Sequence, residues 1–420
     1  MPIGEIDECV TVKYYVESPL DVSKVAKAIA EVQSIGMGGM HEPDSERIVA
    51  RHGARVLDVT PLRGRLECQL PVRTVIDRDS IEAAEITIAY PSVNFKSTIP
   101  NLLTAVAGEL FEMNMITAAK VTDIVFPESF LRDFSGPRFG IGGCRELLGI
   151  FGRPIIGGIV KPCVGLTAER VAALAEEGFN GGLDFIKDDE LLADAPYNSV
   201  RDRVAAVMAS IRRVEERTGE KKMYAFNITD RLDRLRELHD IVVDGGGRCV
   251  MLNAATIGIE AMREFAEYCK VPIHCHRTFA AVWARSPLLG LSFPVLTKLF
   301  RICGADQIHC GAVQGKLYET DDEVLSNMRA CTSSLTSMRP SFPVSSGGQW
   351  AGTVPANAEK IGHNDFIHLA GAGTFLHPDG PAAGARSLRQ AWDAVLQCIP
   401  LHEYAKDHRE LSRALDFFAR

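Results

Sequence analysis

Short apolar runs alternate with longer segments of helical periodicity between residues 155 and 397. The runs are rich in β-branched residues and have the length of buried strands. They predict eight strands, at 155–160, 183–188, 223–228, 249–254, 272–276, 307–311, 342–346 and 365–371. The segments that follow them predict helices, for example at 167–179, 200–219 and 384–397.

Eight strand–helix units over roughly 245 residues match the count and size of a (β/α)8 barrel, an α/β architecture. A doubly wound open sheet is the competing arrangement, but it usually has fewer strands and a glycine-rich first turn. The first turn here reads KPCVGL (161–166). We therefore predict a closed TIM barrel.

The chain before about residue 136 follows a different pattern. Residues 10–18, 55–72 and 83–91 alternate as antiparallel strands do, and helical stretches occur at 21–33 and 101–112. This pattern predicts an α+β, ferredoxin-like domain over 1–136, followed by the barrel domain with a C-terminal helix over 137–420. The segment 126–143, rich in Gly, Pro and aromatic residues, is the predicted linker.

Charge and composition exclude several classes of protein. The 46 Lys and Arg residues and 54 Asp and Glu residues are mixed along the 420-residue chain, which leaves no concentrated basic face for nucleic acid. The apolar stretches are too short to span a bilayer, and the start of the chain lacks the apolar core of a signal peptide. The eleven cysteines include no CxxC pair, so neither a disulfide framework nor a zinc site is indicated. We expect a cytoplasmic protein with reduced thiols.

Polar residues gather where the predicted barrel strands end, and that end carries the active site in this fold. Six strands contribute them: Lys161; Lys187, Asp188, Asp189 and Glu190; His276 and Arg277; His309; Ser345, Ser346, Gly347 and Gly348; and Gly371, Ala372 and Gly373. This concentration predicts an active site at one rim of the barrel.

The KDDE run at 187–190 carries the most specific chemistry of this set. Because side chains alternate along a strand, Lys187 and Asp189 should share a face while Asp188 points away and Glu190 folds back at the turn. Two carboxylates suit Mg²⁺, and a neutral Lys187 that adds CO₂ would supply a carbamate as a third oxygen ligand. The alternative is a solvated charged turn, which is less compatible with the end of a buried strand.

Two anion sites are predicted around this centre. Backbone N–H groups of the Gly347–Gly348 and Gly371–Gly373 loops could hold a phosphate, although ordinary turn glycines are the alternative. Arg277, His309 and Ser346 could complete a second anion site.

Two further residues have both a functional and a structural interpretation. His274 is assigned to the core. Lys316, in the loop GAVQGKLYETDDE (311–323), is either the cation of a closing lid or an ordinary exposed lysine.

Taken together, five motifs resemble ribulose bisphosphate carboxylase (Rubisco) large chains over nearly the full sequence. They are GGIVKPCVGL (157–166), GGLDFIKDDE (181–190), HCHR (274–277), IHCGAVQGKL (308–317) and SSGG (345–348).

The resemblance implies that Lys187 is carbamylated and binds Mg²⁺ with Asp189 and Glu190. It implies catalytic roles for Lys161 near the enolising carbon, His276 beside the substrate and Lys316 on the lid loop. The implied substrate- and phosphate-binding residues are Arg277, His309 and Ser346 at one site, and Gly347, Gly348 and Gly371 at the other.

Departures from the family pattern fall on the carboxylation machinery. Cys163 stands where carboxylases carry a second catalytic lysine, and Ala280 replaces a family histidine. The segment EVQSIGMGGMH (31–41) lacks the family's Thr–Trp pair, Glu109 falls at a family asparagine, and Glu31 is the candidate match for an N-terminal glutamate. The chain therefore resembles a form IV, Rubisco-like protein that does not fix CO₂.

The resemblance further implies a homodimer or higher homo-oligomer that enolises a phosphorylated keto compound. Rubisco-like proteins include decarboxylases and transcarboxylase/hydrolases of 3-oxo-isoapionate 4-phosphate in apiose catabolism, and methionine-salvage enolases and isomerases of methylthio-sugar phosphates. The surplus of anion-binding groups favours the first group, because its substrate carries both phosphate and carboxylate. A non-catalytic regulatory relative is the third alternative, against which the intact metal-binding residues argue.

Overall fold

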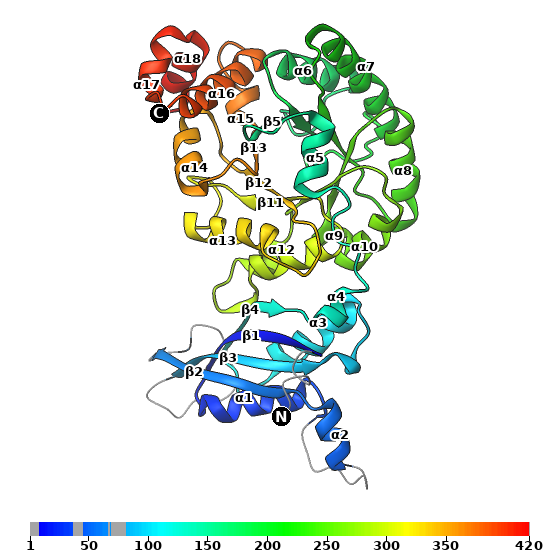
Figure 1. Cartoon of the computed structure of the whole chain (residues 1–420), viewed down its shortest axis with the longest axis vertical. Helices are drawn as coiled ribbons and strands as arrows, with labels where there is room; N and C mark the ends of the chain where they lie inside the picture. Colours follow the sequence, from blue (N-terminus) through cyan, green and yellow to red (C-terminus); the bar gives the residue numbers. More distant parts are fainter. Residues whose placement is uncertain (1–7, 37–44, 66–67, 69–80, 420) are drawn as a thin grey trace. The chain divides into compact units, whose positions relative to one another are not determined.

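The chain forms two compact units in the computed structural model, which describes residues 8–36, 45–65, 68 and 81–419 (Figure 1). One unit is Met1–Ser135 with Ala280–Leu299, and the other is Gly136–Phe279 with Phe300–Arg420. The predicted limits, 1–136 and 137–420, did not anticipate that residues 280–299 group with the first unit.

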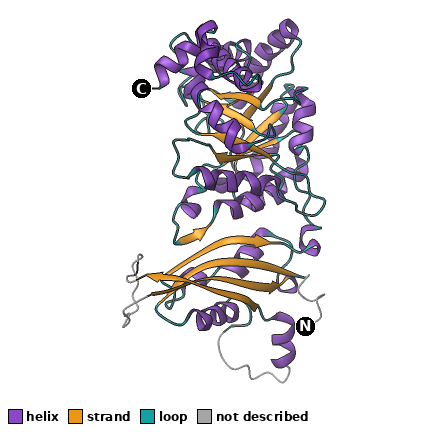
Figure 2. Ribbon diagram, turned by 60° about the vertical axis from the view of Figure 1, so that its left-hand side comes forward, coloured by secondary structure: helices purple, strands orange, loops and turns teal. Residues whose placement is uncertain are grey.

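A five-stranded sheet is the centre of the first unit, shown as orange arrows in Figure 2. Its strands, in sheet order, are β10 (Leu289–Leu291), β4 (Ala118–Val125), β1 (Cys9–Ser18), β3 (Ile81–Pro91) and β2 (Arg55–Arg65). All neighbours are antiparallel except β10 and β4. The α-helices of the unit are α1 (Val22–Val32), α2 (Ser45–His52), α3 (Ile99–Ala107), α4 (Glu128–Leu131) and α11 (Ala281–Ala284), and α12 (Phe293–Ile302) begins in it.

Apolar alternation explains the central strand of this sheet. Val10, Val12 and Tyr14 of β1 have no exposed surface, so one face of the strand packs into the core. Helix α1 begins at Asp21, whose carboxylate accepts the backbone N–H of Lys24 at 3.0 Å. The predicted α+β character of this region is confirmed.

Several predictions in this unit differ from the structure. Strand β4 was missed because its sequence, AAKVTDIV, does not alternate regularly between buried and exposed positions. The predicted helix at 101–112 lies in α3, which ends at Ala107, and a 3₁₀ turn follows at Leu110–Glu112. The predicted strand at 55–72 is observed to Arg65, and residues 66–67 and 69–72 lie outside the described residues.

All eight predicted barrel strands are present, and they close into a parallel barrel. In chain order they are β5 (Ile155–Ile159), β6 (Phe185–Lys187), β7 (Met223–Asn227), β8 (Cys249–Asn253), β9 (Ile273–His276), β11 (Gln307–Gly311), β12 (Phe342–Ser346) and β13 (Ile367–Ala370). Strand β9 pairs with β11 to complete the ring. The predicted fold is therefore confirmed.

Helices surround these strands (Figures 1 and 2). They are α5 (Gly140–Leu148), α6 (Ala168–Asn180), α7 (Val200–Thr218), α8 (Leu232–Asp244), α9 (Ala254–Ile257), α10 (Ile259–Tyr268), α12 (Phe293–Ile302), α13 (Asp321–Thr332), α14 (Val354–Ile361), α15 (Ala372–Phe375), α16 (Pro381–Leu396), α17 (Leu401–Tyr404) and α18 (Arg409–Phe418). Thr167 caps α6 as its sequence predicts, and Gly219 ends α7 with a φ of 73°.

Apolar side chains fill one end of the barrel and leave the other end to polar groups. Phe185, Met251 and Leu369 belong to this core, and Cys144 of α5 packs into it. A Cβ on Gly157 would lie 2.4 Å from a methyl carbon of Leu369, so this strand position requires glycine. Helix α5 begins inside the predicted linker 126–143, which is therefore partly helical.

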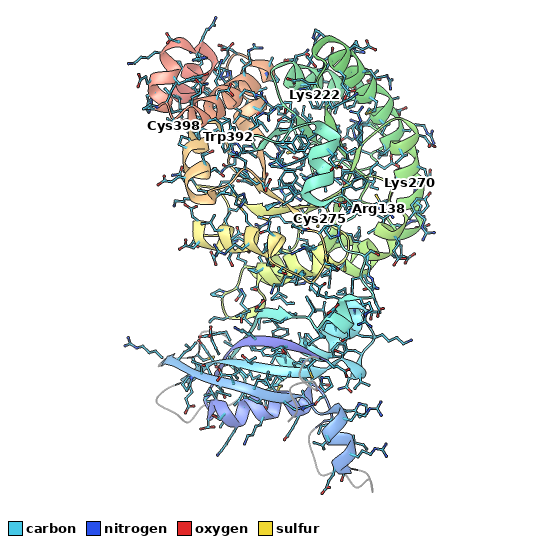
Figure 3. All side chains as sticks on the ribbon, in the orientation of Figure 1. Arg138, Lys222, Lys270, Cys275, Trp392 and Cys398 are labelled. Carbon is cyan, nitrogen blue, oxygen red and sulfur yellow. The ribbon has the colours of Figure 1, made fainter. Side chains whose placement is uncertain are left out.

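The cysteines show no disulfide framework. Every one of the eleven is a free thiol, and Figure 3 labels buried Cys275 on β9 and exposed Cys398 after α16. Among the described residues, no helix is long and apolar enough to cross a membrane.

Candidate active site at the carboxyl ends of the barrel strands

Two lysine–carboxylate pairs lie at the carboxyl ends of β5 and β6. The Nζ of Lys161 is 2.5 Å from Oδ2 of Asp189, and the Nζ of Lys187 is 3.2 Å from Oε2 of Glu190. The Nε2 of His276, at the end of β9, lies 3.4 Å from the same Glu190 oxygen. Residues from three strands therefore converge on one polar centre, as the strand-end pattern predicts.

Asp188 points away from this centre and anchors the turn that carries it. Its carboxylate, which has no exposed surface, accepts hydrogen bonds from Nε of Arg203 at 2.9 Å, the hydroxyl of Tyr224 at 2.6 Å and the backbone N–H of Asn227 at 2.8 Å. The predicted alternation of side chains is thus observed. Arg203 and Tyr224, which lie on α7 and β7, were not predicted from the sequence.

The two lysines differ in environment. Burial lowers the pKa of Lys187, although Glu190 and Asp189 oppose the shift. Burial also acts to lower the pKa of Lys161, but hydrogen bonds to Asp189 and Cys163 outweigh it and the pKa is raised. Lys187 is therefore the more readily neutral amine, and Lys161 holds its proton.

The donor set decides which metal chemistry this centre fits. The described residues contain no group of three or more His, Cys, Asp and Glu side chains arranged to hold a metal ion. Asp189 and Glu190 supply two carboxylates, each now paired with an ammonium group. A carbamate on Lys187 would remove one cation and add an oxygen ligand, so the residues fit Mg²⁺ in the carbamylated state.

Three histidines pack together beside the carboxylates. The backbone N–H of Thr278 donates to Nδ1 of His276 at 3.1 Å, so the proton of the neutral ring lies on Nε2, toward Glu190. His274, predicted to belong to the core, is fully buried, and its Nε2 is 2.7 Å from Nε2 of His309. Burial lowers the pKa of His276 and His309 well below the usual range, so both rings are neutral.

Arg277 does not form the open anion site expected from the sequence. Its guanidinium makes a close ion pair with Glu319 and lies 5.8 Å from the ring centroid of Tyr318. Ser346 ends β12, whose Ser345 pairs with Gly311 of β11. The structure therefore places beside Arg277 a carboxylate, Glu319, from an acidic run for which the sequence predicted no role.

The glycine loops contact the lysine-bearing segments. The backbone N–H of Lys316 donates to the carbonyl oxygen of Gly347 at 3.2 Å, and a Cβ on Gly348 would meet Cβ of Lys316 at 3.0 Å. A Cβ on Gly371 would lie 3.4 Å from Cε of Lys161. Lysine stems thus lie beside both loops predicted to hold phosphate, although the Lys316 side chain remains exposed.

A buried network behind these loops was also missed. Gln349, the residue after Gly348, accepts hydrogen bonds at Oε1 from Nδ2 of Asn357 at 2.8 Å and Nε2 of His368 at 3.1 Å. Its own Nε2 donates to the carbonyl of Val313 at 3.1 Å. The network links the glycine loop after β12 to the base of the Lys316 loop. The QW pair at 349–350 gave no signal of this role.

The residues that depart from the family pattern lie in both units. Sγ of Cys163 accepts a hydrogen bond from Nζ of Lys161 at 3.0 Å, and Ala280 is fully buried. In the first unit, the backbone N–H of Glu109 donates to Gln33 at 3.0 Å beside a cavity of about 860 Å³, and Glu31 lines another of about 640 Å³. Residues 37–41 of the predicted segment lie outside the described residues.

Comparison with known proteins finds two family models and several relatives that match this sequence. Residues 140–418 match the catalytic domain of the ribulose bisphosphate carboxylase large chain, and residues 6–130 match its N-terminal domain. The Rubisco-like protein of Allochromatium vinosum is 40% identical over 97% of this chain and 89% of its own.

Two other relatives have named reactions. The 3-oxo-isoapionate-4-phosphate decarboxylase of Rhizobium etli is 36% identical, over 98% of this chain and 99% of its own. The 3-oxo-isoapionate-4-phosphate transcarboxylase/hydrolase of Xanthobacter autotrophicus is 37% identical, over 98% of this chain and 100% of its own.

Solved structures agree with this likeness. A Rubisco-like protein from Burkholderia fungorum superposes with a TM-score of 0.90 at 36% identity, over 98% of this chain and 100% of its own. A dimeric archaeal Rubisco from Hyperthermus butylicus superposes with a TM-score of 0.82 at 32% identity, over 98% of this chain and 96% of its own.

Proposed function

Because the chain belongs to the ribulose bisphosphate carboxylase large-chain family, we propose that it is a Mg²⁺-dependent enzyme acting through the enolate of a phosphorylated keto sugar acid. The reaction we favour is decarboxylation of 3-oxo-isoapionate 4-phosphate, or transfer and hydrolysis of its carboxylate. Support comes from relatives with these names, each covered almost completely by the alignment.

The lysine–carboxylate centre carries this proposal. Lys187 in its carbamylated form, Asp189 and Glu190 would hold the metal. Bound Mg²⁺ would polarise the substrate carbonyl and stabilise negative charge on its oxygen. A binding protein without catalytic activity has no need of two lysines, one of them fully buried, each paired with a carboxylate, so the centre favours an enzyme.

The chain's own residues supply the remaining chemistry. The protonated Nζ of Lys161 can deliver a proton to the carbanionic carbon left when CO₂ departs, because its raised pKa keeps it charged. The Nε2–H of His276, whose nitrogen lies 3.4 Å from Glu190, can donate a hydrogen bond to a substrate oxygen. The Gly347–Gly348 and Gly371 loops would bind the phosphate, and Lys316 would close over it.

Carboxylation of ribulose bisphosphate is not part of this proposal. Cys163 supplies a thiol where a carboxylase has a lysine, so the second catalytic amine is absent at that position. We further propose a homodimer or a higher homo-oligomer, supported by the dimeric and octameric assemblies named for related Rubiscos.

A substrate panel tests the reaction. Purified protein with Mg²⁺ and bicarbonate should release or transfer CO₂ from keto sugar-acid phosphates, and it should leave methylthio-sugar phosphates unchanged. Lys187→Ala is the control for dependence on the metal centre. Efficient turnover of a methylthio-sugar phosphate alone would instead establish a methionine-salvage enolase or isomerase.

A further inference from the structure

A buried ion pair joins Arg277, which follows β9, to Glu319 of the loop after β11. The side chain of Arg277 is 9% exposed and that of Glu319 is 3% exposed, and they contact each other directly. Breaking such a pair is costly because one charge would remain buried without a partner. Glu319 is therefore part of the Arg277 environment in this structure.

Local packing places this pair at the end of β11. A Cβ on Gly311 would lie 3.2 Å from Nη1 of Arg277 and 3.7 Å from Oε2 of Glu319, so both groups lie over a residue without a side chain. Gly311 pairs with Ser345, which precedes Ser346. The ion pair thus lies where the sequence predicted that Arg277 and Ser346 would bind an anion.

The charges at this position nearly cancel. Arg277 contributes one positive charge and Glu319 one negative charge, while neighbouring His309 is neutral. A phosphate monoester carries between one and two negative charges near pH 7 and would be held against the Glu319 carboxylate. A like charge within about 4–6 Å disfavours a bound anion, and each 1.36 kcal/mol of repulsion corresponds to about a factor of ten in affinity.

The glycine-loop end has the opposite character. Lys161 lies against Gly371, and the stem of Lys316 lies against Gly348. A dianion at these loops would meet backbone N–H groups and lysines.

We propose that Glu319 is a specificity-determining residue that restricts this enzyme to substrates with a single phosphate. The phosphate binds at the glycine loops, and the Arg277–Glu319 pair receives an uncharged polar end of the substrate. The inference rests on the proposed function for the location of the substrate, but it concerns binding and is measured without turnover.

The test compares Glu319→Gln with Asp322→Asn, which removes the same charge from an exposed residue nearby. Isothermal titration in Mg²⁺ and bicarbonate would use ribulose 5-phosphate and ribulose 1,5-bisphosphate as probes. Wild type should prefer the monophosphate. Glu319→Gln should tighten bisphosphate binding about 10-fold or more and leave monophosphate binding nearly unchanged, whereas Asp322→Asn should alter neither.

A double variant covers the case in which Glu319→Gln fails to fold. Arg277→Gln with Glu319→Gln removes both charges and should restore the wild-type ratio of the two affinities. Three results would overturn the proposal. They are tighter binding of the bisphosphate than of the monophosphate by wild type, no increase in bisphosphate affinity in Glu319→Gln, and an altered ratio of the two affinities in the double variant. If only the proposed function is wrong, the affinity ratios will be as expected but keto sugar-acid phosphates will not be turned over.

Discussion

Replacing Lys161 by methionine separates metal binding from proton transfer. Lys161 Nζ is 2.5 Å from Asp189 Oδ2, and Asp189 is only 2% exposed. If Asp189 is a metal ligand, Mg²⁺ and the Lys161 ammonium compete for it in the metal-free protein. Methionine keeps an unbranched apolar chain of similar reach and removes the competing charge.

The geometry gives the expected magnitude. A hydrogen bond between charged groups contributes about 1.5–3 kcal/mol, and each 1.36 kcal/mol corresponds to a factor of ten. Lys161→Met should therefore bind Mg²⁺ roughly 10- to 150-fold more tightly than wild type. Catalytic turnover should nevertheless fall, because the variant has no Nζ proton to deliver.

Calorimetric titration with Mg²⁺ in bicarbonate buffer measures the affinity. Lys360→Met is the matched control, because Lys360 forms a 2.6 Å ion pair with Asp321 in which the lysine is 45% exposed. Its loss should leave Mg²⁺ affinity unchanged. Unaltered or weaker Mg²⁺ binding by Lys161→Met would refute the idea that Asp189 exchanges a lysine for the metal.

Four other expectations can be measured. Lys187→Ala should abolish activity and weaken Mg²⁺ binding, and full wild-type activity in CO₂-free buffer with a chelator would contradict carbamylation. Labelled bicarbonate should not enter phosphoglycerate from ribulose bisphosphate, because Cys163 replaces an amine; clear incorporation would show that this departure was misread. Tyr224→Phe should lower the free energy of unfolding in urea by about 1.5–3 kcal/mol, since one bond to buried Asp188 is lost. Burial lowers the pKa of His368 to about 3, so its ring stays neutral in the native state, whereas in the unfolded chain it takes up a proton below about pH 6.5. The free energy of unfolding should therefore decrease as the pH is lowered. His368→Asn should reduce the slope of unfolding free energy against pH by about 1.4 kcal/mol per unit between about pH 4 and 6, and an unchanged slope would contradict it.

Local periodicity was sufficient for the barrel because its strands are short, buried and separated by helices. Phe342–Ser346, for example, was predicted with the observed limits. The grouping of residues 280–299 with the first unit was not predicted, since the pairing of β10 with β4 joins segments about 170 positions apart, which no local pattern reports.

The site was predictable where the strand itself sets the geometry. Alternation along β6 places Lys187 toward Glu190 and Asp188 toward Arg203. Glu319 could not be predicted, because its approach to Arg277 depends on the path of an irregular loop.

The buried network behind the glycine loop gives the protein an optical reporter. The indole N–H of Trp392 donates to Nδ1 of His368 at 3.0 Å, and His368 in turn contacts Gln349 beside Gly348. Trp392 is 1% exposed and is one of three tryptophans in the chain. A ligand that moves the Gly348 backbone would disturb this chain of hydrogen bonds and change the emission of an indole shielded from water. We therefore expect ligand binding at the Gly347–Gly348 loop to change the intrinsic fluorescence of the protein, without a label.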